Sequence, residues 1–280
     1  MRKKGGRVWI MKNKDGTTRK SRAMTTENAR RVKLAGHKAE EEFANLIQGY
    51  KYPGSKKKDI VDTQGNVHSI KSGDKKWQIF LYSKNRFETS IGFLGAKLFL
   101  DCINSFPEKR KDYLKNKEIF KISLQKPMQN LKDFLSKKDN SPYFLHGTKI
   151  IFLQEALFHG SEVDYLTIKE GVVFNIFDAR EVIGTIDESI EIANSKAMQQ
   201  LGQMDDQKVI FKSNIDGTTI GEIEMRNDSD IHYKQVKFWM DREKTLNLLR
   251  LKIIKKKQVG ANIITYGKAI NRFKLLEVKK

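Results

Sequence analysis

Cysteine, proline and long apolar runs are all scarce in this chain of 280 residues. The one cysteine, Cys102, excludes a disulfide within the chain and a cysteine-based zinc site, and it favours a reducing compartment. No segment approaches the roughly 20 consecutive apolar residues of a membrane-spanning helix, and no apolar segment of a signal peptide follows the basic N-terminus. We therefore expect a cytoplasmic protein without a membrane partner.

The sequence signatures of several enzyme classes are also missing. The five histidines show neither His-x-x-x-His nor Glu-x-x-His spacing, so a zinc enzyme is not indicated. The chain has no Gly-x-x-x-x-Gly-Lys-Ser/Thr loop, no Gly-x-Gly-x-x-Gly turn and no Gly-x-Ser-x-Gly elbow. Nucleotide hydrolysis, dinucleotide redox chemistry and serine-hydrolase chemistry therefore lack support.

Positive charge, in contrast, is abundant. Lys and Arg number 54 against 34 Asp and Glu, which gives a net charge of +20 and a pI of about 9.8. Self-repulsion of this size opposes a compact fold, and a polyanionic partner would relieve it. Nucleic acid is the first candidate, and a generally Lys-rich composition is the alternative. Residues 1–25 are especially basic and predict an arm that lies on phosphates, or else a solvated tail.

The stretch 58–71 predicts a β-hairpin that carries chemistry. Gln64-Gly65-Asn66 is typical of a turn because Gly and Asn tolerate positive φ, and the apolar residues on either side favour strands. Folding about Gly65 places Asp59 opposite Lys71, with Ser69 on the same face as Lys71. A carboxylate beside an ammonium group suits metal-assisted cleavage of a phosphodiester. The alternative is a simple surface ion pair.

A helix is predicted from Thr25 or Thr26 to about Gln48, because apolar residues recur there at helical spacing. At 100° per residue, Glu40 and Glu42 flank the apolar stripe, so either can project along the edge of a sheet beneath the helix. With 39% hydrophobic residues available for a core, we expect an α/β fold.

The order of these features resembles the PD-(D/E)XK nuclease superfamily, and within it the type II restriction endonucleases. The matching residues are Gly36-His-Lys-Ala-Glu40, Gly54-Ser-Lys-Lys-Lys-Asp59, Ser69-Ile-Lys71, and Gln78 on the next predicted strand, Lys75 to Tyr82. The resemblance implies a PD-(D/E)XK-like catalytic core over 26–140, with a central mixed sheet flanked by helices. An α+β DNA-recognition region over 141–280 would follow, either separate from the core or forming one domain with it.

The resemblance also implies a Mg²⁺-dependent cut of double-stranded DNA by a homodimer. Asp59 and Glu40 would bind the metal ion, with the carbonyl of Ile70 as a further ligand. Lys71 would position the attacking water and stabilise negative charge on the phosphate.

One departure from the family pattern affects the metal ligands. Ser69 stands where the family usually has Asp or Glu, so one carboxylate ligand is missing. Ser69 is expected to hydrogen-bond a water of the metal shell instead. Glu40, Glu42 and Glu88 are the candidates to supply the missing acid.

Two segments of the second half predict contacts with DNA. The stretch 222–234 is dense in side chains that read base edges in the major groove. The stretch 260–267, after a Lys run, resembles terminal segments of some restriction enzymes. The predicted DNA contacts are Arg226, Asn227, Asp228, Lys234, Lys255, Lys256, Lys257, Asn262 and Gln78.

Three alternatives remain open. Asp216 with Glu222 and Glu224 forms a rival carboxylate cluster. A structure-specific nuclease, such as a Holliday-junction resolvase, would share the catalytic core. The third alternative is a DNA-binding protein without catalysis, in which Ser69 marks an inactive site.

The remaining segments predict mixed secondary structure. Helices are expected over 92–105, over 108–138 with a break at Pro127, over 187–201 and over 233–254. Strands are expected over 150–153, 165–168, 172–177, 209–212, 218–225 and 261–266.

Overall fold

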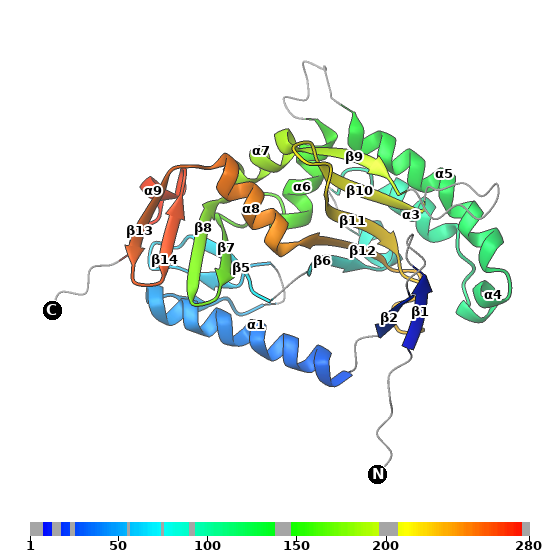
Figure 1. Ribbon diagram of the computed structural model, residues 1–280, viewed down its shortest axis with the longest axis horizontal. Helices are drawn as coiled ribbons and strands as arrows, with labels where there is room; N and C mark the ends of the chain where they lie inside the picture. Colours follow the sequence, from blue (N-terminus) through cyan, green and yellow to red (C-terminus); the bar gives the residue numbers. More distant parts are fainter. Residues whose placement is uncertain are drawn as a thin grey trace, which may run out of the picture.

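The computed structural model describes residues 8–12, 18–22, 26–54, 57–73, 76–89, 93–137, 147–195 and 207–275 (Figure 1). In this part of the chain a seven-stranded mixed sheet has the order β13-β14-β8-β7-β5-β4-β3. Its parallel pairs are β5 with β7 and β8 with β14, and the other neighbours are antiparallel. The strands are β3 (Tyr50–Lys51), β4 (Ile60–Val61), β5 (Val67–Lys71), β7 (Tyr165–Glu170), β8 (Val173–Asp178), β13 (Lys256–Gly260) and β14 (Ile263–Tyr266).

Helices cover both faces of this sheet. On one face, Phe43 and Ile47 of α1 (Thr26–Ile47) and Ala269 of α9 (Ala269–Arg272) pack against buried strand residues such as Ile60 and Ile176. The other face packs against the second layer of helices, α6 (Thr148–Phe158), α7 (Ala179–Ser189) and α8 (Arg242–Lys252). The expected α/β fold with a large mixed sheet flanked by helices is therefore confirmed.

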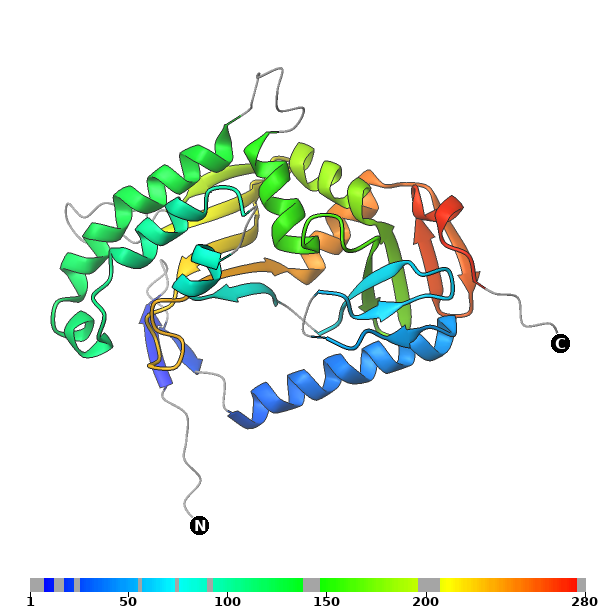
Figure 2. The same cartoon turned by 180° about the vertical axis from the view of Figure 1, so that it is seen from behind.

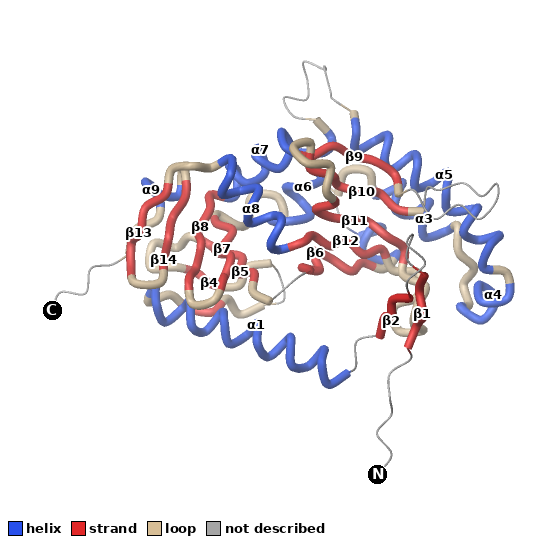
Figure 3. The backbone as a smooth tube through the Cα atoms, in the orientation of Figure 1, coloured by secondary structure: helices blue, strands red, loops and turns tan. Residues whose placement is uncertain are grey.

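A second sheet, of five antiparallel strands, has the order β6-β12-β11-β10-β9. Its strands are β6 (Lys76–Tyr82), β9 (Ile190–Asn194), β10 (Lys208–Ser213), β11 (Thr219–Met225) and β12 (Val236–Asp241). Helices α3 (Ala96–Asn104), α5 (Lys117–Ser136) and α6 lie over one face, as Figures 2 and 3 show. The short helices α2 (Lys84–Thr89) and α4 (Arg110–Lys115) join the same layer.

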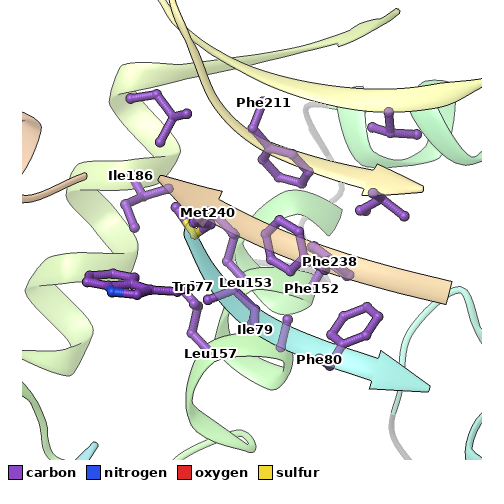
Figure 4. Close-up of a cluster of buried hydrophobic side chains, with 14 of the residues drawn as sticks. Trp77, Ile79, Phe80, Phe152, Leu153, Leu157, Ile186, Phe211, Phe238 and Met240 are labelled. Carbon is purple, nitrogen blue, oxygen red and sulfur yellow. The ribbon is translucent and has the colours of Figure 1, made fainter. Parts of the chain in front are cut away.

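The two sheets share the larger core. Phe80, Phe211 and Phe238 of the five-stranded sheet pack around Phe152 of α6 (Figure 4). The same cluster continues to buried residues of the seven-stranded sheet such as Ile168. Each of the two sheets combines strands from both sides of residue 140, so the predicted catalytic core and recognition region pair with each other directly.

Several predicted elements are wrong, and local chemistry explains them. The expected strand 150–153 belongs to α6, because a short buried apolar run has no periodicity that separates strand from helix. The expected helix 187–201 ends at Ser189 and gives way to β9, and residues 196–201 lie outside the described part. The expected helix 233–254 begins as β12 and becomes helical only after Asp241, whose side chain accepts the N–H of Lys244.

Other predictions fare better. Helix α1 occupies its predicted range, and α3 lies within the predicted 92–105. The break expected at Pro127 is wrong, because α5 continues through this residue. The basic arm forms an antiparallel pair, β1 (Val8–Lys12) with β2 (Thr18–Arg22), while residues 1–7, 13–17 and 23–25 lie outside the described part. No helix of the described chain is long and apolar enough to cross a membrane.

Candidate functional site

The predicted hairpin is present as β4 and β5, but its register differs from the expectation. Ile60 pairs with His68, so Asp59 lies across from Ser69, and not across from Lys71 as predicted. The backbone N–H of Asp59 donates to the carbonyl of His68 over 3.0 Å. Asp59 therefore lies across from Ser69, the position at which the PD-(D/E)XK pattern usually has an Asp or Glu.

The turn chemistry explains this shift. The Oδ1 atom of Asp62 accepts the N–H groups of Gln64 and Asn66 at 2.9 and 2.8 Å, and the Asp62 N–H donates to the Asn66 carbonyl. These bonds centre the hairpin on Gln64, one residue before Gly65. Because a one-residue shift of the centre moves the pairing by two, the partner of Asp59 changes from residue 71 to residue 69.

The Asp59 carboxylate joins the two strands through its Oδ2 atom. This oxygen accepts the backbone N–H of Ile70 at 2.6 Å and the hydroxyl of Ser69 at 3.4 Å, and it lies 3.7 Å from the Nζ atom of Lys71. The Lys71 ammonium also donates to Ser69 Oγ at 2.7 Å and to the Ile70 carbonyl at 3.1 Å. The structure thus brings Asp59, Ser69 and Lys71 into one contact group.

Of the two candidate carboxylates on helix α1, Glu40 acts on Asp59 through its charge, and its own contacts are with Lys51 and His37. Glu40 is only partly exposed, and its Oε2 atom contacts Lys51 Nζ at 2.7 Å and His37 Nδ1 at 3.2 Å. Glu42 points elsewhere and forms an ion pair with Lys169 of β7.

The surroundings of Asp59 make its carboxylate harder to ionise. Burial raises the pKa of Asp59 above its ordinary value, and the charge of Glu40 adds to the rise. The ammonium of Lys71, the N–H of Ile70 and the hydroxyl of Ser69 oppose the rise without cancelling it. A cation bound here would favour the ionised carboxylate.

The oxygen donors of the site fit a hard divalent ion. Within the described residues, the hydrogen bonds and ion pairs of Asp59 and Glu40 all end on a single oxygen of each carboxylate. No group of three or more His, Cys, Asp or Glu gathers in the described part, so an ion would rely on these two carboxylates, the Ile70 carbonyl and water. Mg²⁺ is typically held in this way and keeps several waters.

No sequence signal pointed to Lys57, which precedes β4 and points toward β6 and α6. Its ammonium donates to the Ile79 carbonyl of β6 at 2.9 Å and to the Ala156 carbonyl of α6. Burial, reinforced by the charge of Lys71, lowers the pKa of Lys57 from 10.5 to about 7. In the sequence this residue belongs to a Lys run, which resembles a solvated loop and gives no sign of burial.

The rival carboxylates are engaged with lysines. Glu222 and Glu224 of β11 contact Lys208 Nζ at 2.9 and 3.0 Å, and Glu224 lies 3.4 Å from Lys237 Nζ. Burial alone would raise the pKa of Glu224, but the two ammonium groups lower it below its ordinary value. Asp216 lies in the β10–β11 turn, where its carboxylate accepts the N–H and hydroxyl of Thr218. The structure therefore brings together two of the three rival acids.

The predicted base-reading segment is bonded within the protein. Arg226 donates to both carboxylate oxygens of Asp228, at 2.7 and 2.6 Å. Asn227 donates to the Tyr113 hydroxyl at 2.8 Å, and Lys234 contacts Glu108 at 2.6 Å. Contacts of these side chains with bases would compete with the bonds that they already make.

The remaining predicted positions are spread over the molecule. The run from Lys255 to Lys257 is exposed and leads into β13, which is the edge strand farthest from β3 in the sheet order. Asn262 lies in the β13–β14 turn. Gln78 is exposed on β6, opposite Trp239. Glu88 pairs with Lys84 on the surface of α2.

Comparisons with known proteins add nothing to this geometry. No protein-family model matches the chain, and searches of the curated proteins and of the solved structures found no match. The functional argument therefore depends on the site and on the sequence resemblance.

Proposed function

We propose that this protein is a Mg²⁺-dependent endonuclease that cleaves double-stranded DNA at specific sequences. The observation that carries the proposal is the contact of Asp59, Ser69 and Lys71 across the hairpin, with the charge of Glu40 acting on Asp59. The net charge of +20 and the resemblance to PD-(D/E)XK restriction endonucleases support the same function.

Each side chain has a role that follows from its contacts. Asp59, Glu40 and the Ile70 carbonyl would hold the Mg²⁺ ion, which supplies Lewis-acid polarisation of the phosphodiester. The Lys71 ammonium stabilises the charge that builds on the phosphate as a water molecule gives up a proton to solvent and its oxygen bonds to phosphorus. The P–O ester bond then breaks, and the leaving oxygen takes a proton from solvent. The Ser69 hydroxyl accepts a hydrogen bond from Lys71 and orients it.

Sequence specificity, dimerisation and a cytoplasmic setting are finer parts of the proposal. Arg suits guanine and Asn suits adenine in the major groove, so Arg226 and Asn227 are the proposed base readers. A homodimer would present two copies of the site to the two strands of a symmetric target. The single Cys102 suits a reducing compartment.

Cleavage assays on plasmid, linear and branched DNA, with and without Mg²⁺, test the proposal. Lys71→Ala should lower the cleavage rate at least about 100-fold while DNA binding persists, because Lys71 acts on the transition state. Lys169→Ala is the matched control, since Lys169 lies on the neighbouring strand and pairs with Glu42. Its cleavage rate should stay close to that of the wild type.

The other outcomes separate the alternatives. Cleavage of branched DNA alone would indicate a structure-specific nuclease, and tight binding without any cleavage would indicate a DNA-binding protein without catalysis. Loss of activity in Glu222→Gln or Glu224→Gln, with Lys71→Ala still active, would move the site to β11.

A further inference from the structure

The first half of α1 extends past the sheet on which the helix rests. Ala39, Phe43 and Ile47 are buried, whereas Val32 and Leu34 are 54% and 60% exposed. Figures 1 and 2 both show this half running beyond the seven-stranded sheet toward β1 and β2. The side chains of residues 30–35 are exposed and not committed to the core.

One face of this half leads directly to the candidate site. Arg30, Lys33, His37 and Glu40 follow one another at intervals of three, four and three residues, so they lie within an arc of about 80° on the helix. Arg30 and Lys33 are exposed, and His37 contacts Glu40 at 3.2 Å. We call Arg30 and Lys33 the basic stripe.

The stripe lies a few nucleotides' length along the helix axis from Glu40. At 1.5 Å per residue, Lys33 lies about 10 Å and Arg30 about 15 Å along the helix axis from Glu40. Phosphates of one DNA strand advance about 3.4 Å along the duplex axis per nucleotide. The stripe is therefore within reach of phosphates about three to five nucleotides from one held at the site.

We infer that the basic stripe is a phosphate track, in which Arg30 and Lys33 hold the backbone of duplex DNA a few nucleotides from the phosphate on which Asp59 and Lys71 act. The identity of that reacting phosphate rests on the proposed function. Duplex DNA is the proposed occupant because the stripe offers cations at a fixed spacing on a rigid helix. The net charge of +20 also favours binding of a polyanion.

The same helix supplies a matched control. Arg31 and Lys38 are also exposed, but the 100° rotation per residue places them on the side of α1 opposite Lys33. The double variants Arg30→Ala/Lys33→Ala and Arg31→Ala/Lys38→Ala therefore remove the same charge from the same element. All four side chains are exposed, so both variants should melt within a few degrees of the wild type.

Fluorescence anisotropy of a labelled duplex, titrated without divalent metal at several salt concentrations, tests the track. Each lost phosphate contact lowers the slope of log affinity against log salt by about 0.9, so the stripe variant should lose about 1.8. The affinity difference from the wild type should then shrink about tenfold between 50 and 200 mM salt. The control variant should keep a slope close to that of the wild type.

Kinetics supply a second readout in Mg²⁺. The stripe contacts the backbone away from the reacting phosphate, so Arg30→Ala/Lys33→Ala should raise KM and leave kcat within about twofold. Equal slopes for the two double variants would overturn the track, whether both match the wild type or both fall. If the wild type cleaves no DNA, the proposed function fails, while the metal-free slopes still decide whether the stripe binds phosphates.

Discussion

Lys57 offers a quantitative test of how the hairpin is attached to the rest of the fold. Its ammonium donates to the carbonyls of Ile79 and Ala156, which belong to β6 and α6. The pairing register of β6 skips Ile79, because Phe80 pairs with Phe238 and Gln78 with Trp239. This bulge at the sheet edge provides the Ile79 carbonyl with which Lys57 bonds. Lys57→Met keeps the side-chain length and removes both the charge and the donor.

The sign of the pH effect follows from the direction of the pKa shift. Burial and the charge of Lys71 lower the pKa of Lys57 to about 7 in the folded protein, against 10.5 in the unfolded chain. Between these values the unfolded state binds more protons than the native state, so the stability contributed by Lys57 rises with pH. Burying the protonated Lys57 destabilises the folded protein; this loss of stability is fully present below pH 7 and disappears as the pH approaches 10.5. Linkage gives a gain of about 2 kcal/mol between pH 7 and pH 9.

Urea unfolding of the wild type and of Lys57→Met at pH 7, 8 and 9 measures this gain. Other groups that titrate in this range contribute to both proteins and cancel in the difference. The wild type should gain about 2 kcal/mol relative to Lys57→Met across the interval, whatever the offset at pH 7. Stability curves that stay parallel within about 0.5 kcal/mol would show that Lys57 is solvated and does not link the hairpin to β6.

Three further predictions concern the core, the metal site and the base-reading segment. Phe152→Ala should lower the free energy of unfolding by about 3–5 kcal/mol in urea titrations, because its ring is buried at the centre of the aromatic cluster. Glu40→Gln should reduce Mg²⁺-dependent cleavage more than Glu42→Gln does, and equal activity in both would assign the missing acid elsewhere. Arg226→Ala should weaken binding of the cognate duplex more than of a scrambled one, by about 1–3 kcal/mol in gel-shift titrations. Asp228→Ala should strengthen cognate binding by releasing Arg226, and equal losses for both duplexes with Arg226→Ala would make the segment a backbone clamp.

Local patterns predicted the local parts of the site. The turn residues predicted the hairpin, and helical spacing predicted α1 with its two flanking carboxylates. The register was wrong because Asp62 closes the turn with its side chain, which moves the centre of the hairpin to Gln64. Glu40 pairs with Lys51 and Glu42 with Lys169, and the places of these two lysines in the sheet are set by pairing that the sequence alone does not show.

Partners distant in the sequence could not be predicted. The sequence predicted the strand 75–82 but not its partner: β6 pairs with β12 in the other sheet, and β7 lies next to β5. The burial of Lys57 follows from this arrangement, since both of its acceptors lie on elements remote from the hairpin. The strand β12 was predicted as part of a helix over 233–254, because its apolar residues lead without a break into those of α8.

The crossing of strands between the two halves of the chain has a consequence for biosynthesis. When residues 26–140 leave the ribosome, β5 emerges before β7, one of its two neighbours, and β6 emerges before β12, its neighbour in the described sheet. Unpaired strand edges and the apolar faces of α3 and α5 then stay open until about a hundred more residues have been translated, and such intermediates are prone to aggregate. Nonlocal pairing also slows folding. We therefore expect the nascent chain to depend on chaperones, and expression of residues 26–140 alone to yield insoluble polypeptide.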